Sequence, residues 1–223
     1  MSLEFQSFGK IARLSREAIV TEKIDGTNAQ IYIVPKAEVS DTDELVSVYK
    51  SEAMVIFAGS RNRWITPKAD NYGFAKWVQQ NAEELLRLGP GRHFGEWWGA
   101  GIQRRYGQTQ KRFSLFNVNR WVPQWPGNPF SGVYDAEAPF NALNCCQVVP
   151  TIWRGNFDTS EINDFVEMLG FEGSFAAPGF KQPEGLVVYH TASGTLFKKT
   201  LEHDESPKTL VPNPDWQTPP TPE

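Results

Sequence analysis

The chain has 223 residues, 40% of them hydrophobic and 13% aromatic, so it can bury one large core or two small ones. Its two cysteines are adjacent (Cys145 and Cys146) and its three histidines are scattered, which excludes a disulfide framework and the usual zinc-ligand spacing. This cysteine usage favours the cytoplasm, and we expect neither a membrane span nor a signal peptide.

The net charge of −4 lies entirely at the end of the chain. Residues 202–223 carry five acidic side chains and one basic side chain, whereas residues 1–201 are neutral. We therefore expect a folded domain over 1–201 and a disordered, acidic, Pro-rich tail over 202–223. The net charge argues against an obvious nucleic-acid binder, but a neutral body can still carry a local basic groove.

Apolar runs between turn residues predict strands, in chain order, at 17–34 (two strands around a turn at Lys23), Leu45–Tyr49, Met54–Ala58, 92–98, 112–118, Gln147–Ile152, Gly185–Tyr189 and Thr195–Lys199. Two helices are predicted, one from Asp70 or Asn71 to about Leu88 and one from Thr159 or Ser160 to Leu169. Residues 120–144, rich in Pro, Gly, Asn and Trp, are predicted to form a long surface excursion. Many strands with two helices predict an α+β fold.

The turn Thr21-Glu22-Lys23-Ile24-Asp25-Gly26-Thr27-Asn28 places one lysine beside a carboxylate, a glycine and two small polar side chains. A lysine at a strand–turn–strand junction can be held at the floor of a pocket, where its amine acts as a nucleophile once it has lost its proton. Taken alone, the pattern fits a solvated turn lysine equally well.

Downstream segments supply groups that suit a nucleotide. Gly59-Ser60-Arg61-Asn62-Arg63 suits a phosphate or a ribose edge, and Glu96, among aromatic residues and glycines at a strand end, suits a ribose hydroxyl or a metal. One aromatic side chain of Phe113–Val118 could stack on a purine, although core packing is the commoner role of such residues.

The last two segments suit the charges of a triphosphate and its cation. Glu184 opens a strongly apolar strand, a good position for a ligand of a divalent metal. Lys198 and Lys199 end the final hairpin, where they could neutralise a triphosphate. Each segment, judged alone, could be ordinary surface charge.

In order, these segments resemble the signatures of the covalent nucleotidyltransferases, which comprise ATP-dependent DNA ligases, RNA ligases and mRNA-capping guanylyltransferases. The signatures are Lys-x-Asp-Gly, an arginine after the next hairpin, Gly-Glu at a strand end, a Phe-rich strand, Glu-Gly before an apolar strand, and a final lysine pair; the resemblance covers about residues 20–200. Gly26-Thr27-Asn28, Phe94-Gly95-Glu96-Trp97 and Gly101-Ile102-Gln103 are similar to the RNA ligases that seal nicks in duplex RNA.

The resemblance implies a nucleotidyltransferase (adenylation) domain of antiparallel sheets with flanking helices. It implies that ATP donates AMP to Lys23 in the presence of Mg²⁺ or Mn²⁺, that AMP passes to a 5′-phosphate end, and that a 3′-hydroxyl then displaces it to seal RNA. By position, it implies catalytic roles for Lys23, Asp25, Lys198 and Lys199. It implies nucleotide contacts for Glu22 (near the adenine), Asn28, Arg61, Glu96 (on the ribose), Phe116 (stacked on the adenine), Lys198 and Lys199, and a metal contact for Glu184.

Four arginines are the expected contacts with nucleic acid: Arg61, Arg63, Arg104 and Arg105. For Arg61 the expectation comes from the resemblance, which places it at the nucleotide and the 5′-phosphate end. For Arg104 and Arg105 it comes from the basic stretch that they form with Lys111 and Arg112, and a solvated loop is at least as good an explanation.

The chain departs from the family pattern at two places. The family usually separates its last two lysines by one residue, so which of Lys198 and Lys199 is essential stays open. Only 23 residues follow Thr200, too few for the OB-fold of DNA ligases or the helical domain of nick-sealing RNA ligases. We expect a bare catalytic domain, of a kind suited to bacteriophage repair in a host cytoplasm, that holds RNA weakly or needs a partner protein.

Three other functions fit the sequence. A DNA ligase would use the same chemistry, because recognition of the ribose 2′-hydroxyl depends on local geometry. A guanylyltransferase is disfavoured by the missing OB-fold. A non-catalytic nucleotide- or nucleic-acid-binding module would bind ATP without a covalent adduct, although the intact Lys23, Glu96 and Glu184 argue against it.

Overall fold

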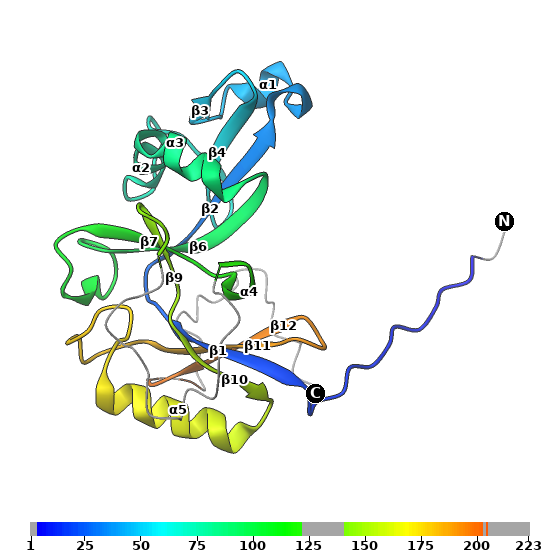
Figure 1. Ribbon diagram of the computed structural model, residues 1–223, viewed down its shortest axis with the longest axis vertical. Coiled ribbons are helices and arrows are strands. Elements are labelled where there is room, and N and C mark those ends of the chain that lie inside the picture. Colours follow the sequence, from blue (N-terminus) through cyan, green and yellow to red (C-terminus); the bar gives the residue numbers. More distant parts are fainter. Residues whose placement is uncertain (1–3, 122–140, 203, 205–223) are drawn as a thin grey trace, which may run out of the picture.

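The computed structural model describes residues 4–121, 141–202 and 204. Most of the predicted 120–144 excursion and of the predicted 202–223 tail lies outside the described residues. No helix in the described ranges is long and apolar enough to cross a membrane. The described chain is an α+β fold of two sheets with a few helices, as predicted (Figure 1).

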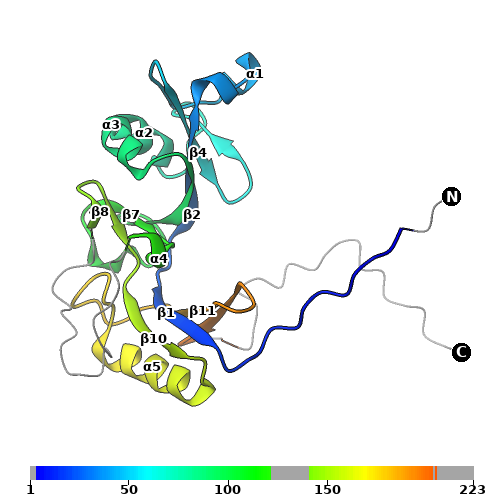
Figure 2. The same cartoon turned by 45° about the vertical axis from the view of Figure 1, so that its right-hand side comes forward.

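The small sheet is antiparallel and has the spatial order β10 (Thr151–Asn156), β1 (Glu17–Lys23), β11 (Gly185–His190) and β12 (Thr195–Thr200). Helix α5 (Thr159–Glu172) covers one face of this sheet (Figure 2). Ala18, Val20, Leu186 and Val188 of the sheet pack there against Phe165 and other apolar residues of the helix. Burial of this amphipathic helix stabilises the sheet that carries Lys23.

The large sheet is mixed and has the order β3 (Tyr49–Lys50), β4 (Met54–Ser60), β2 (Thr27–Pro35), β6 (Gly91–Gly99), β7 (Lys111–Leu115), β9 (Cys146–Val148) and β8 (Asn141–Leu143). Strand β5 (Trp64–Ile65) pairs with β4, and β7 with β9 is the parallel pair. The helices α2 (Phe74–Gln80) and α3 (Ala82–Leu85) and the 3-10 helix η2 (Leu86–Leu88) pack on one face of this sheet. The shorter elements are α1 (Asp41–Glu44), α4 (Val118–Trp121) and the 3-10 helices η1 (Lys36–Glu38) and η3 (Arg105–Gly107).

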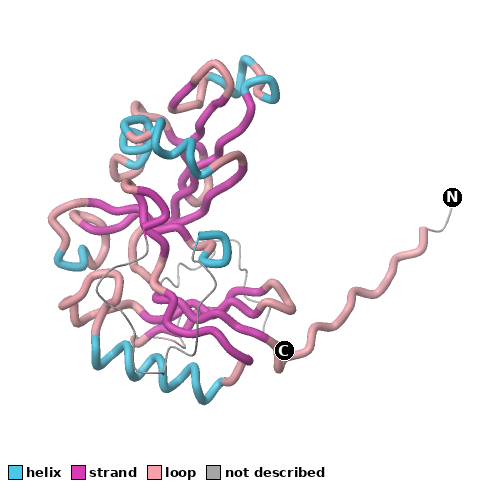
Figure 3. The backbone as a smooth tube through the Cα atoms, viewed as in Figure 1, coloured by secondary structure: helices cyan, strands magenta, loops and turns pink. Residues whose placement is uncertain are grey.

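The chain crosses between the two sheets at two adjacent points. One is the turn from β1 to β2, and the other is Val149-Pro150 between β9 and β10; the Glu22 N–H donates to the Pro150 carbonyl at 2.9 Å. An apolar cluster that includes Ile24, Val149 and Trp98 fills the joint. In Figure 3 the strands run through the middle of the body and most helices lie outside them. The Lys23 turn therefore sits in the joint between the sheets.

Some predicted elements differ in the structure. The predicted strand Leu45–Tyr49 is wrong, because the N–H groups of Leu45, Val46 and Ser47 donate back to carbonyls of residues 42–44 and continue the turn of α1. Only Tyr49–Lys50 is a strand. The predicted strand Gln147–Ile152 is two strands in different sheets, separated by Val149-Pro150. Strand β7 ends at Leu115, three residues before the predicted end.

The helix boundaries also differ from the predictions. The helix predicted to start at Asp70 or Asn71 begins at Phe74, but the Asp70 carboxylate still accepts the N–H groups of Ala75 and Lys76. It is interrupted at Asn81, whose side chain donates to the Trp77 carbonyl, because asparagine side chains compete for backbone groups. Helix α5 is capped by Asp158 and continues through Gly170 to Glu172.

Candidate active site

Lys23 is the last residue of β1 and pairs with Gly185, the first residue of β11. Its Nζ donates to Glu184 Oε2 at 2.6 Å. The Glu184 side chain is only 2% exposed, whereas that of Lys23 is 24% exposed. Gly185 has φ +150, and a Cβ there would meet the Lys199 carbonyl, so only glycine lets β12 approach so closely. The turn lysine is thus held on a buried carboxylate and still reaches solvent.

Glu96 holds the other end of the lysine turn. Its carboxylate accepts the Gly26 N–H at 3.1 Å and the Asn28 side-chain amide at 3.0 Å. A Cβ on Gly26 would lie 2.5 Å from the Trp97 carbonyl, so the turn can lie against β6 only with glycine there. Burial raises the pKa of Glu96 to about 7, while the nearby Lys23 charge and the two hydrogen bonds oppose this shift.

Asp25 is hydrogen-bonded to the loop that follows β6. Its N–H donates to the Tyr106 hydroxyl at 2.8 Å, and its carboxylate accepts from Arg104 Nε at 3.2 Å. Arg104 also donates to the Gln182 carbonyl and to Glu202. Arg104 therefore ties the lysine turn to two later segments of the chain; its predicted position at the edge of a nucleic-acid groove stays a prediction.

The loop that carries Arg104 and Tyr106 has an unusual backbone. Gln103, Arg105 and Tyr106 all have positive φ values, a conformation that residues other than glycine rarely adopt. The Tyr106 ring is 1% exposed and packs between Trp98 and Phe180, with centroids 5.2 and 4.7 Å away. Burial raises the pKa of Tyr106 above its usual range, so the hydroxyl stays protonated. This packing fixes the loop against the lysine turn.

Glu22 points to the other face of β1 and is 1% exposed. Its carboxylate accepts from the Ser174 hydroxyl at 2.6 Å and from the N–H groups of Phe175 and Ala176, both at 2.8 Å. Burial raises the pKa of Glu22 to about 7 against these three hydrogen bonds. Glu22, predicted to lie near the adenine, therefore fastens β1 to the segment after α5.

Phe116 lies just beyond β7, where its N–H donates to the Phe94 carbonyl. Phe94 shares a face of β6 with Glu96, because side chains alternate along a strand. Phe116 is 42% exposed and Phe94 is 52% exposed, so neither ring is part of the core. The structure thus puts two accessible aromatic rings beside Glu96, of which the sequence analysis had selected one.

The two final lysines lie on opposite faces of β12. Lys198 pairs with Val187 and shares the Lys23 face of the small sheet. Lys199 is on the α5 face and forms an ion pair with Asp204 at 2.8 Å. Their alternation thus brings only Lys198 to the face of the nucleophile.

The predicted arginines other than Arg104 are exposed. Arg61 follows Ser60, which pairs with Ala29, so it emerges beside the start of β2. Arg63 donates to the Ala69 carbonyl at 3.2 Å, and Arg105 lies in the loop of positive φ values. The register of β2 with β4 therefore places Arg61 beside Asn28.

Comparison with known proteins identifies the family. The family model described as RNA ligase matches residues 16–200, which include both crossings between the sheets. The chain belongs to the RNA ligase family. This confirms the resemblance read from the sequence motifs, and no curated protein matches this family member.

Solved structures of Naegleria gruberi RNA ligase share the fold. An apo mutant has a TM-score of 0.51 and 19% identity over 83% of this chain and 50% of that chain. A mutant with ATP and Mn has a TM-score of 0.51 and 18% identity over 83% and 49%, and a mutant with AMP and Mn has 0.52 and 17% over 84% and 50%. This family member spans about half the length of those structures.

The contacts made by Tyr106 and by the Ser174–Ala176 segment could not be predicted from the sequence. Nothing in the sequence marks Tyr106, because its role depends on the unusual backbone of its loop and on the Trp98 ring. The Glu22 carboxylate is evident in the sequence, but the groups that donate to it lie 152 to 154 positions further along the chain. Such long-range pairs leave no local pattern.

Proposed function

We propose that this chain is the catalytic domain of an ATP-dependent RNA ligase that works through a covalent lysyl-AMP intermediate. The observation that carries the proposal is the 2.6 Å hydrogen bond from Lys23 Nζ to the buried Glu184 carboxylate, within the region that matches the RNA ligase family. The carboxylate fixes the position of the amine, which reaches solvent and can attack a nucleotide once it has lost its proton.

In the first step, Lys23 Nζ attacks the α-phosphorus of ATP, a P–N bond forms, and pyrophosphate leaves with the electrons of the broken P–O bond. The amine must be neutral to attack, and Glu184 Oε2 is the acceptor next to its proton. AMP then passes from Lys23 to an oxygen of an RNA 5′-phosphate, which restores the amine. Finally, a 3′-hydroxyl attacks the adenylated 5′-phosphate, the phosphodiester forms, and AMP leaves.

The same geometry supports roles for the neighbouring groups. Glu96 accepts hydrogen bonds from the turn and, in its ionised form, has lone pairs left for ribose hydroxyls. Phe116 is accessible for stacking on the adenine, and Glu22 supports the adenine end through the segment that it binds. Arg61 and Lys198 supply positive charge for the phosphates, which is worth most where water is excluded.

A divalent cation fits this site as a partner of Glu184 and the nucleotide phosphates. The described residues contain no cluster of three or more His, Cys, Asp or Glu side chains that could hold a metal alone. Magnesium commonly uses one or two carboxylates with substrate phosphates, so the single buried carboxylate of Glu184 suits Mg²⁺ or Mn²⁺. Such an ion offsets phosphate charge when bound. The mutants of Naegleria RNA ligase with ATP and Mn support this choice.

The proposed domain covers residues 1–201, followed by the acidic tail from 202.

The substrate we propose is RNA, with a nicked duplex as the first candidate, because the family match is to RNA ligases. A partner protein would supply further nucleic-acid contacts. A DNA ligase of the same chemistry is distinguished by a panel of nicked duplexes with RNA or DNA on each side of the nick.

The deciding experiment is intact-protein mass spectrometry after incubation with ATP and Mg²⁺ or Mn²⁺. We expect a mass increase of one AMP in the wild type and none in Lys23→Ala. Arg105→Ala, at an exposed position outside the proposed catalytic groups, is the matched control and should acquire AMP normally. A folded wild type that binds ATP but acquires no AMP with either metal, and was not already adenylated, would be a binding module instead.

A further inference from the structure

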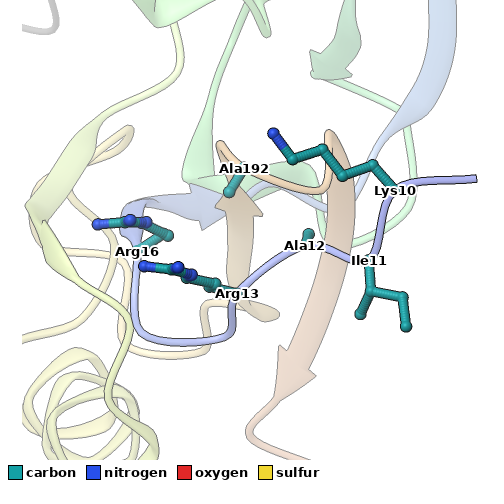
Figure 4. A pocket seen from close by; sticks show the side chains of 6 residues that line it. All are labelled: Lys10, Ile11, Ala12, Arg13, Arg16 and Ala192. Atoms are coloured by element: carbon teal, nitrogen blue, oxygen red, sulfur yellow. The ribbon is translucent and has the colours of Figure 1, made fainter.

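The N-terminal segment forms a basic hollow with the turn between β11 and β12. The hollow has a volume of about 460 Å³ and is lined by Lys10, Ile11, Ala12, Arg13, Arg16 and Ala192. In Figure 4 the side chains of Arg13 and Arg16 extend in the same direction. Three of the six lining residues are cations and none is acidic, so the hollow favours an anion.

The backbone that presents Arg16 is fixed to the body of the domain. The Leu14 carbonyl accepts a hydrogen bond from His190 Nε2 at 2.8 Å, and the Arg16 carbonyl accepts one from Phe157 N–H at 2.8 Å. The Glu17 carbonyl accepts from the N–H and the hydroxyl of Thr191. Residues 14–17 are thus held by the end of β10 and by the β11–β12 turn, so Arg16 emerges from a fixed position.

These cations have no acidic partner in the part of the chain that the structure describes. Lys10, Arg13 and Arg16 are all exposed, and none of them forms an ion pair with a described residue. The nearest acidic side chain in sequence, Glu17, is held instead by the guanidinium of Arg154 at 2.9 and 3.1 Å. Among the described residues, no acidic side chain therefore neutralises the charges at the hollow.

The side chains that line the hollow favour phosphate among anions. It has no aromatic ring, amide or carboxylate that could recognise a base, whereas arginine forks match phosphate oxygens. The hollow lies at the Glu17 end of β1, and Lys23 lies at the other end, about 20 Å away at about 3.3 Å per residue. A strand of A-form RNA, at about 2.8 Å of rise per nucleotide, covers that distance in about seven nucleotides.

We propose that Lys10, Arg13 and Arg16 bind backbone phosphates of the RNA about seven nucleotides from the break that Lys23 seals. This contact is independent of base sequence, because phosphates position nucleic acid without specifying it. It allows the domain to bind RNA although the net charge of the chain is −4. The inference rests on the proposed function.

The test is the salt dependence of binding to a fluorescently labelled nicked RNA duplex, from about 50 to about 200 mM KCl. The variant is Lys10→Gln with Arg13→Gln and Arg16→Gln. The control, Lys36→Gln with Lys68→Gln and Lys76→Gln, removes the same charge from other exposed positions. We expect the first triple variant to bind about ten-fold or more weakly at low salt, with a log–log salt slope smaller by about two to three. Its self-adenylation should equal that of the wild type.

A length series makes the test independent of that variant's folding. Shortening one hairpin-closed duplex arm from about eight to about three base pairs, below the span to the hollow at about 2.8 Å per A-form step, should weaken wild-type binding but leave the triple variant unaffected. Equal affinity and slope for variant and wild type would overturn the proposal, as would wild-type binding that is insensitive to the length of both arms. Absence of RNA binding at low salt would overturn it too. Failure of the wild type to self-adenylate is a separate result, which would contradict the proposed function.

Discussion

Lys198 lies on the same face of the small sheet as Lys23, whereas its neighbour Lys199 lies on the opposite face. The register fixes this, because Lys23 pairs with Gly185, Lys198 pairs with Val187, and Lys199 pairs with Leu186, which packs against α5. Adjacent residues of a strand point to opposite faces. Because the two lysines are adjacent in the sequence, only Lys198 is on the face of the small sheet that carries Lys23.

We predict that Lys198→Ala slows formation of Lys23-AMP by about 100-fold or more, because it removes a positive charge from the developing pyrophosphate. Lys199→Ala should change the rate by less than about three-fold, since it loses an exposed ion pair with Asp204 that is worth little. The measurement is single-turnover self-adenylation at saturating ATP. An equal loss in both variants would mean that the lysines act through structure instead of the site.

A second prediction separates the two arginines that the sequence analysis treated alike. Arg104→Gln should slow self-adenylation by about ten-fold or more, because the Asp25 carboxylate loses its guanidinium partner and the lysine turn loosens. Arg105→Gln should leave that rate unchanged, because its side chain is exposed. The variant Arg104→Lys should recover part of the rate. If Arg104→Gln weakens only RNA binding, the predicted groove role is right and the positioning role is wrong.

The third prediction concerns the pH dependence of ATP binding. The pKa of Glu96 is about 7, so this carboxyl is mostly protonated at pH 6 and mostly ionised at pH 8. The ionised form is the better acceptor for ribose hydroxyls, so the KM for ATP should rise about ten-fold as the pH falls through this range. Glu96→Gln should have a high KM without this dependence. Any pH dependence that the variant retains belongs to ATP or the metal, and an unchanged profile would contradict the ribose role.

The fourth prediction tests the adenine contact. Phe116→Ala should weaken ATP binding by about ten-fold or more, because base–aromatic stacking is worth about 1–3 kcal/mol. Phe94→Ala is the matched control, since this ring is also accessible and is adjacent across the ladder. Isothermal titration of the Lys23→Ala background with ATP separates binding from chemistry. A larger loss in Phe94→Ala would transfer the stacking role to that residue.

The strands that carry the motifs could be predicted because their signals are local. The apolar runs before and after Lys23 and on either side of Ser193 predicted β1, β2, β11 and β12 within a few residues. The division of these strands between two sheets could not be predicted, because pairing is a long-range property. The same holds for Pro150, where one predicted strand is in fact two strands in different sheets.

Residue types suggested the candidate site, but the partners of those residues came from tertiary structure. The motif identified Asp25, yet the Tyr106 and Arg104 that hold it are about 80 positions away. Motif spacing likewise left Lys198 and Lys199 equivalent until the strand register separated them. Sequence patterns of this kind identify reactive groups, whereas their positioning depends on contacts that leave no short-range pattern.

The last prediction concerns the stability of the joint at Glu22. The folded chain keeps the Glu22 proton up to about pH 7, whereas the unfolded chain releases it near the ordinary pKa of 4.5. Between these values the folded state binds more protons, so the free energy of unfolding falls as the pH rises, by at most about 1.4 kcal/mol per pH unit. This contribution is complete below about pH 4.5 and lost above about pH 7.

Glu22→Gln should remove that slope, because its amide stays neutral and its oxygen can still accept the N–H groups of Phe175 and Ala176. Urea unfolding at several pH values between 5 and 8 measures the difference between the wild type and the variant, in which the titration of all other groups cancels. Glu38→Gln, at an exposed glutamate, is the control and should keep the wild-type slope. If Glu22→Gln also keeps it, the Glu22 carboxylate is already ionised in the folded chain at low pH, and its three hydrogen bonds outweigh its burial.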